Sequence, residues 1–290
     1  MKIRNIILFL LISFLISGLW LAFGDKNLFR SGYNIAVING SGLAKKFKDY
    51  RNVKEVLTYD DNNQALSDIT KGKVDAAIMD RVMGLYLIKK AGYSGIRMAG
   101  DLINKEYLAV AFPKEDKALR QAINKALSEI IKNGTYAEIS KKYFGRDILK
   151  GRTINVTYKD EPIATDGSWA RVKKMGRICF AMSGIYPPFD YFNDNNELVG
   201  FNVEIAKEVC AVLNVKYEPV ITGRNTIEGL KTKRYDAIWD NLIIREDLMD
   251  IVEFSDPYCV SGAQLFVRRD STITGLKSLE TILFRSIVHI

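Results

Sequence analysis

The chain of 290 residues has little histidine and little cysteine: it contains one histidine and three cysteines. The histidine, His289, stands next to the end of the sequence. A catalytic triad or a cysteine–histidine pair needs an imidazole beside its nucleophile, so we expect neither, and most classes of hydrolase are excluded. The cysteines are too widely separated to suggest a metal site. We therefore expect no catalytic residues, no metal and no cofactor.

The cysteines form an odd set, so at most one pair of them can join in a disulfide. Cys179 falls in an expected core strand and Cys210 on the apolar side of an expected helix, and Cys259 is the third. We expect buried free thiols, which behave as small apolar side chains. No cysteine follows the N-terminal apolar run, so a lipoprotein anchor is excluded.

The sequence also lacks a strong excess of charge of one sign. Its 42 basic and 34 acidic residues give a net charge of +8, part of which belongs to the N-terminal leader. Charges of both signs are mixed on expected helices, as at Lys45–Asp49. Solvated helix faces explain this pattern, so we expect no nucleic-acid partner. The length accommodates about two domains.

An apolar run from Ile6 to Phe23 follows a basic N-terminus. The small residues Ala22 and Gly24 fit a signal-peptidase site, so residues 1–24 are predicted to be a signal peptide. The run is also near the length that spans a membrane, so an uncleaved anchor at residues 6–23 is the alternative. In either case the rest of the chain is exported. We expect it in the periplasm, touching a membrane only through this segment.

From residue 33 to 148, strands alternate with helices, which is typical of an open α/β sheet. A β-branched run at Tyr33–Asn39 passes through Gly40-Ser41-Gly42 into a helical pattern at Leu43–Tyr50. The N–H groups at such a helix start attract anions. The later elements of this run are predicted as strands at Val53–Thr58, Val74–Met79 and Leu108–Phe112, and as helices at Asn63–Lys71, Arg81–Ala91, Lys117–Asn133 and Tyr136–Tyr143.

Residues 149–165 lack periodicity and are predicted to form a linker, with one strand at Thr153–Thr157. Asp166 and Ser168 offer caps for a short helix that ends at Lys174. A second alternating run occupies residues 166–290. Its strands are predicted at Ile178–Met182, Lys216–Pro219, Tyr235–Trp239 and Leu265–Val267, and its helices at Asn202–Leu213 and Asn225–Lys231.

The two runs share one helix-to-strand motif. The segments Lys71–Ile78 (KGKVDAAI) and Lys231–Ile238 (KTKRYDAI) each close a helix and open a buried strand. Polar side chains follow the two strands, Asp80 in the first run and Asn241 in the second. The carboxyl ends of strands in open α/β sheets face the ligand crevice, so two such lobes predict a hinged trap. Alternatively, Asp80 caps the helix that follows it.

Taken together, these motifs resemble the solute-binding proteins of family 3, the type II periplasmic amino-acid-binding proteins of ABC importers. The front-lobe motifs lie in the second run: Tyr186–Phe189 (YPPF), Gly200–Ala206 (GFNVEIA), Asp236–Ile238 (DAI) and Phe254–Tyr258 (FSDPY). The rear-lobe motifs lie in the first: Gly40-Ser41, Val74–Asp80 (VDAAIMD), Asn133–Tyr136 (NGTY) and Lys142–Gly145 (KYFG). The resemblance implies an α/β fold of two lobes, each an open, mostly parallel sheet flanked by helices.

The resemblance also implies roles for individual residues. Tyr186 matches the aromatic that packs on the ligand, and Asp80 matches the carboxylate that pairs with the ligand's α-ammonium. Ser41 and Gly42 match the turn that meets the α-carboxylate. The expected ligand-binding set is completed by Ser183, Asn241 and Arg245.

One position departs from the family pattern. The family places an arginine that clamps the ligand carboxylate where this chain has Leu248. Arg245 lies one turn earlier and has two interpretations. It reaches the same carboxylate, or it is a surface residue paired with Glu246 or Asp247.

The order of the halves departs as well. Family members begin with the front lobe, whereas here the rear lobe and its return helices come first, at 33–148, and the front lobe follows at 166–290 and is truncated. Two interpretations are open. The chain is a circular permutant that closes one cleft, or it is a fragment of a tandem double binding protein. In the second case the apolar tail after Glu280 lacks a partner.

The implied function is periplasmic capture of a small solute, an amino acid or related zwitterion, for the permease of an ABC importer. A membrane-anchored sensory or interaction module and a degenerate, ligand-free fragment are the alternatives. A cyclohexadienyl-dehydratase-like enzyme is less well supported. That reaction needs a carboxylate-binding arginine and a general acid in the cleft.

Overall fold

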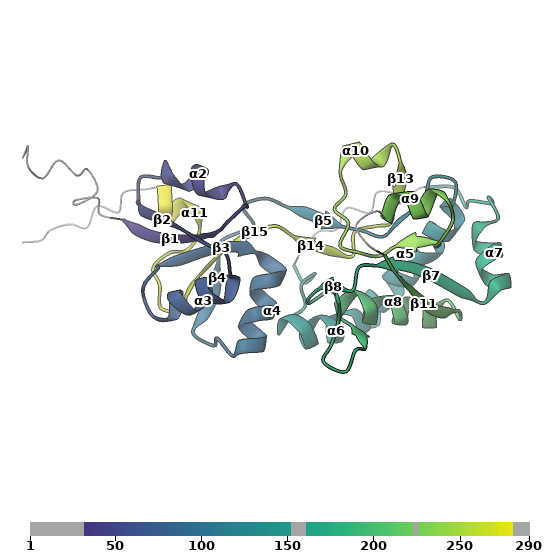
Figure 1. Cartoon of the computed structure of the whole chain (residues 1–290), viewed down its shortest axis with the longest axis horizontal. Coiled ribbons are helices and arrows are strands. Elements are labelled where there is room, and N and C mark those ends of the chain that lie inside the picture. Colours follow the sequence, from purple (N-terminus) through teal and green to yellow (C-terminus); the bar gives the residue numbers. More distant parts are fainter. Residues whose placement is uncertain (1–31, 152–160, 223–225, 281–290) are drawn as a thin grey trace, which may run out of the picture.

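The computed structural model describes residues 32–151, 161–222 and 226–280. They form two lobes joined by a narrow waist (Figure 1), which confirms the predicted two-lobed α/β architecture. The predicted signal segment and the expected strand Thr153–Thr157 lie outside the described residues. Within these three ranges, no helix is both long and apolar enough to cross a membrane.

The rear lobe is a five-stranded sheet in the order β2-β1-β3-β15-β4. The first three strands are parallel, and β15 runs antiparallel to both of its neighbours. Alternate side chains of β1 face opposite ways: Ile35 and Val37 pack in the cluster of Phe47 and Leu279, and Ala36 packs in the other cluster. The elements are β1 (Tyr33–Ile38), α2 (Leu43–Lys48), β2 (Val53–Tyr59), α3 (Asn62–Thr70), β3 (Ala76–Asp80), α4 (Arg81–Ala91), β4 (Ile96–Ala99), β15 (Ala263–Arg268) and α11 (Leu276–Glu280).

The front lobe is a second five-stranded sheet, in the order β11-β7-β12-β6-β13. Three of these strands are parallel, and β6 runs antiparallel to β12 and β13. Its sheet strands are β6 (Ala111–Pro113), β7 (Arg177–Met182), β11 (Lys216–Ile221), β12 (Ala237–Ile238) and β13 (Val252–Phe254). Its helices are α5 (Lys117–Lys132), α6 (Thr135–Phe144), α7 (Ser168–Met175), α8 (Phe201–Val212), α9 (Thr226–Lys231) and α10 (Glu246–Met249). A small sheet of β8 (Ile185–Tyr186), β9 (Asp190–Phe192) and β10 (Leu198–Val199) follows β7.

Two antiparallel strands cross the waist, β5 (Glu106–Leu108) and β14 (Cys259–Ser261). The chain leaves the rear lobe along β5 and returns to it along β14, so the two strands form the hinge between the lobes. At the end of β14 the backbone of Gly262 lies so close to its neighbour that an added Cβ would stand 2.1 Å from the Asn104 carbonyl oxygen. With φ at 125° as well, this position requires glycine.

The pairing of two segments differs from the sequence expectation. Leu108–Phe112 was expected as one strand, but β5 pairs with β14 in the hinge and β6 pairs inside the front lobe. Leu265–Val267 was expected to complete the second run, but β15 lies in the rear-lobe sheet between β3 and β4. The rear lobe therefore takes strands from both ends of the described chain, and the front lobe is built from the stretch between the two crossings.

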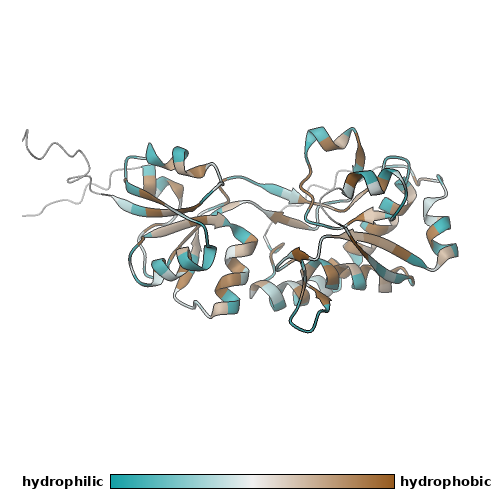
Figure 2. Ribbon diagram, viewed as in Figure 1, coloured by the Kyte–Doolittle hydropathy of each residue, from teal (hydrophilic) through white to brown (hydrophobic). Residues whose placement is uncertain are grey.

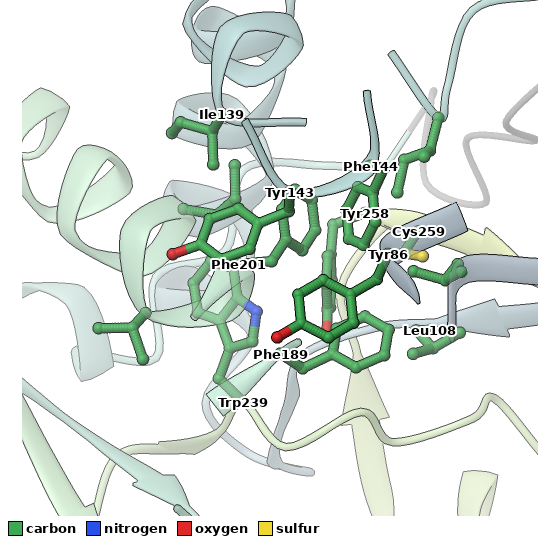
Figure 3. Packing of buried hydrophobic residues seen from close by; sticks show 14 of the residues in the cluster. Tyr86, Leu108, Ile139, Tyr143, Phe144, Phe189, Phe201, Trp239, Tyr258 and Cys259 are labelled. Carbon is green, nitrogen blue, oxygen red and sulfur yellow. The ribbon is translucent and has the colours of Figure 1, made fainter. Parts of the chain in front are cut away.

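Hydrophobic residues are frequent along the strands of both sheets, while hydrophilic residues colour much of the helices and loops (Figure 2). Beside the hinge, an aromatic cluster joins the lobes (Figure 3). Phe201 is at its centre and packs edge-on against Tyr136, Phe144 and Phe189. Tyr86 of the rear-lobe helix α4 and Leu108 of the hinge belong to the same buried cluster. The lobes are therefore held together by packing as well as by the two hinge strands.

Candidate functional site

A cavity of about 780 Å³ lies between the lobes. The rear lobe contributes the loop after β1, the end of β3 and the start of α4, and the hinge contributes β5 and the end of β14. The front lobe contributes Tyr186, Pro187, Phe189, Asn241 and Ile243. A pocket of this volume that is lined mostly by apolar groups and a few polar ones is typical of a small-molecule site.

Ser41 lies on the cavity wall in the turn between β1 and α2. Its hydroxyl donates a hydrogen bond to the Ile38 carbonyl oxygen at 2.6 Å, so it holds the turn as well as lining the site. Gly42 is the residue before α2 and adopts a left-handed φ of 69°, but it does not line the cavity. The turn therefore presents Ser41, and Gly42 shapes the backbone behind it.

Asp80 ends β3 and lines the cavity. Its Oδ1 accepts a hydrogen bond from the Met83 N–H at 2.8 Å, which caps α4. Its Oδ2 accepts one from the Ser261 hydroxyl at 2.5 Å. Asp80 is therefore a helix cap and a wall residue at once. Its carboxylate keeps acceptor capacity for a ligand, because two oxygens offer about four lone-pair positions.

Two residues beside Asp80 were not singled out from the sequence. Glu106 on β5 lines the cavity, and its Oε1 accepts a hydrogen bond from the Asn104 side-chain amide at 2.9 Å. Arg81 is 2% exposed and donates hydrogen bonds to the carbonyl oxygens of Val260 and Ile148, at 2.8 and 3.0 Å. No local pattern marks either residue, because the carbonyl partners of Arg81 are distant in the sequence and Glu106 reaches the cavity through the pairing of β5 with β14.

The front-lobe wall carries an exposed aromatic. Tyr186 ends the short strand β8, is 57% exposed and lines the cavity. A cis Pro187–Pro188 bond follows, and then Phe189, which is buried in the aromatic cluster and also reaches the cavity. The structure thus brings Tyr186 and Asp80, from opposite lobes and distant in the sequence, to one cavity.

Asn241 also lies on the cavity wall, shortly after β12. Its φ is 53°, a left-handed conformation that asparagine adopts more readily than most residues. Its Oδ1 accepts a hydrogen bond from the Asn202 side-chain amide at 3.1 Å. The side chain is therefore oriented from within the front lobe, by the first turn of α8.

Ser183 and Arg245 do not line the cavity. The Ser183 hydroxyl donates a hydrogen bond to Asp190 at 3.0 Å. The Arg245 guanidinium pairs with Asp247 at 3.0 Å, and its side chain is 58% exposed. The structure therefore supports the second interpretation of Arg245, a surface residue that is paired with Asp247. Leu248, at the family's arginine position, is buried.

A pair of carboxyl groups lies behind the front-lobe wall. Asp190 is fully buried, and its Oδ1 accepts hydrogen bonds from the Ser183 N–H at 3.1 Å and the Gly184 N–H at 2.8 Å. Its Oδ2 and the Asp240 Oδ1 have no donor within the described ranges. Burial and the Asp240 carboxylate raise the pKa of Asp190 to about 7, and burial raises that of Asp240. Asp190 therefore keeps its proton to a higher pH than a solvent-exposed aspartate does.

The cysteines are free thiols: Cys210 and Cys259 are buried, and Cys179 is half-buried. Burial raises the pKa of the Cys210 thiol to about 12, so it stays protonated. In the part of the chain that the structure describes, no group of three or more histidine, cysteine, aspartate or glutamate side chains is arranged to hold a metal ion.

Comparisons with known proteins bear on the family to which this chain belongs. A family model described as bacterial extracellular solute-binding proteins, family 3, matches residues 21–146 and 178–286. The chain is 38% identical over 121 residues to the "Probable amino-acid-binding protein YxeM" of Bacillus subtilis, covering 40% of this chain and 46% of that protein. It is 33% identical over 115 residues to the L-cystine-binding protein TcyJ of Escherichia coli, covering 38% and 43%.

Among solved structures, the arginine-bound form of truncated ArgBP from T. maritima is 34% identical, with a TM-score of 0.30 and coverage of 31% of this chain and 42% of that chain. The chain spans less than half the length of the curated relatives it matches. The family match, in contrast, extends over well more than half of this chain and includes both lobes. The chain therefore belongs to the bacterial extracellular solute-binding proteins, family 3.

Proposed function

We propose that the cleft binds a small solute with an amino group, an amino acid or related zwitterion, and that the protein delivers it to the permease of an ABC importer. The observation that carries this proposal is that one cavity of about 780 Å³ is lined from both lobes and from the hinge. A ligand there contacts both lobes at once, so binding favours a closed arrangement of the lobes over an open one.

The wall residues suit such a solute. Asp80 accepts a charge-assisted hydrogen bond from the ammonium group. Tyr186 packs on the apolar part of the solute, because its ring is exposed into the cavity. Ser41 and Asn241 supply neutral polar contacts from the two lobes.

The names of the relatives support an amino-acid-like solute and a binding role without catalysis. One is named an L-cystine-binding protein, and another, from Salmonella typhimurium, a histidine-binding periplasmic protein. Binding proteins of this kind work outside the cytoplasm. We therefore propose export to the periplasm by the N-terminal segment, either cleaved after residue 24 or retained as an anchor at residues 6–23. N-terminal sequencing of the mature protein separates the two.

A thermal-shift screen with the standard amino acids and simple polyamines tests the function. A ligand present at 100 times its Kd stabilises the folded protein by about 2.7 kcal/mol, which raises Tm by roughly 5–10 °C for a chain of this size. Asp80→Asn should abolish the shift and leave the unliganded Tm nearly unchanged, because asparagine keeps an oxygen to cap α4. Absence of any shift in the folded protein would count against binding, and turnover of prephenate would indicate an enzyme instead.

A further inference from the structure

The charges on the cavity wall are unbalanced. Its ionisable groups that are charged at neutral pH are Asp80, Glu106 and Lys46 within the described ranges. The front-lobe wall contributes none of them: its residues there are Tyr186, Pro187, Phe189, Asn241 and Ile243. The cavity therefore carries two carboxylates against one ammonium, and all three charges lie on the rear lobe and the hinge.

The two carboxylates lie on one cavity, and Ser261 relates the strands that carry them. Glu106 on β5 stands directly opposite Ser261 on β14 in the antiparallel hinge, so their side chains lie on the same face. The Ser261 hydroxyl is hydrogen-bonded to Asp80 at 2.5 Å. Glu106 Oε2, unlike Oε1, accepts no hydrogen bond from the described residues. Two amino groups on one ligand would therefore each find a carboxylate acceptor on the wall of the same cavity.

Few charged groups on the wall can hold a ligand carboxylate, although the Asn241 Nδ2, which has no hydrogen-bond partner among the described residues, offers a neutral donor. Arg245 is paired with Asp247 outside it, and no guanidinium lies on the described wall. Lys46 is the single cation there, and its ammonium lies 6.0 Å from the ring centroid of Phe47, over a buried aromatic. The hydroxyl of Ser41 and the N–H of Gly40 are already engaged within the turn.

We infer that the preferred solute is an organic cation with two amino groups, held by Asp80 and Glu106, and that its carboxylate, if it has one, contributes little to affinity. The inference rests on the proposed capture of a solute in this cleft. The exposed ring of Tyr186 and the edge of Phe189 face the same space, and aromatic rings suit the methylene chain and the charge of such a cation. A diamine and a basic amino acid both satisfy this description.

Isothermal titration calorimetry on the full folded protein tests it with matched pairs: lysine against cadaverine, and arginine against agmatine. Each pair differs by the carboxylate alone. We expect the decarboxylated compound to bind within about tenfold of its amino acid, or more tightly, because no guanidinium clamps the carboxylate. A loss of tenfold or more without the carboxylate would overturn the inference and leave the proposed function standing. If neither these compounds nor the other amino acids bind, the proposed function itself fails.

Variants locate the second amino group. Glu106→Gln is nearly isosteric, and it should lower the affinity for cadaverine by about tenfold or more. It should lower the affinity for n-butylamine, which has one amino group, by clearly less. Glu129→Gln is the matched control, since Glu129 is exposed on α5 in the front lobe. If Glu106→Gln changes cadaverine affinity no more than this control does, Glu106 does not hold an amino group and the inference is wrong.

Discussion

The Ser261 hydroxyl donates a 2.5 Å hydrogen bond to the Asp80 carboxylate and so joins the end of hinge strand β14 to the strand that lines the rear wall of the cleft. Asp80 ends β3 and Ser261 ends the crossing strand, 181 residues further along the chain. A movement of the hinge strands would therefore displace the Asp80 carboxylate, which we propose to bind the ligand's ammonium.

This contact predicts that Ser261→Ala weakens ligand binding. The substitution removes the side-chain donor to Asp80 Oδ2, so we expect a loss of about three- to tenfold in affinity by calorimetry. We also expect a loss of about 1 kcal/mol in the free energy of unfolding in urea, because Ser261 is buried. Ser94→Ala, at an exposed position in the rear lobe, is the control. Unchanged affinity in Ser261→Ala would mean that Asp80 needs no support from the hinge.

The buried Arg81 predicts a loss of stability at the hinge. Its guanidinium satisfies the carbonyl oxygens of Val260 in β14 and of Ile148 after α6. Arg81→Met leaves both acceptors buried without these donors, which should cost at least ~2 kcal/mol in urea unfolding. Arg51→Met, at an exposed position, should stay within about 0.5 kcal/mol of the parent protein. Equal stability of the two variants would show that Arg81 does not support the hinge.

The carboxyl pair behind the front-lobe wall predicts a pH dependence of stability. Asp190 loses its proton near pH 7 in the folded protein, against an ordinary value of 3.8. Between these values the folded state binds more protons than the unfolded state. Stability from this group is therefore greatest at low pH and falls as pH rises through that window, by up to about 1.4 kcal/mol per pH unit.

Asp190→Asn should remove much of this dependence. An asparagine oxygen can still accept the N–H groups of Ser183 and Gly184, and its amide can donate to Asp240. We therefore expect the variant to exceed the parent in urea-unfolding free energy at pH 8 and to approach it near pH 4. Asp194→Asn, an exposed position in the turn after β9, should follow the parent curve. Parallel curves for Asp190→Asn and the parent would contradict the raised pKa of Asp190.

The surface ion pair of Arg245 predicts a result that separates the two interpretations of this residue. Because its guanidinium is bound to Asp247 away from the cavity, Arg245→Ala should change affinity for lysine by less than about twofold. A loss of tenfold or more would mean that Arg245 reaches the ligand when the lobes close.

Local patterns predicted most of the elements but not how they pair. Helix α4 begins and ends where expected, because Asp80 caps its start and Gly92, with φ at 72°, ends it. The pairing of β15 with β3, and of β5 with β14, joins segments far apart in the sequence. No periodicity within a strand specifies a distant partner, so the lobe to which Leu265–Val267 belongs was not predictable from its own residues.

The residues of the candidate site also divide into those that local patterns predicted and those that depend on distant pairing. Asp80, Tyr186, Ser41 and Asn241 follow strands or belong to family motifs, and all four line the cavity. Glu106 was missed because its place on the wall depends on the hinge pairing with β14. Asp190 and Asp240 were missed because their proximity depends on the fold of the hairpin after β7.

Small-angle X-ray scattering of the full chain, with and without a saturating concentration of the tighter-binding of lysine and cadaverine, tests most directly whether the two lobes close on one ligand. We predict that the radius of gyration decreases on binding in the parent protein and stays constant in Asp80→Asn. An unchanged radius of gyration in a parent protein that calorimetry shows to be saturated would contradict closure of the lobes around a shared cleft.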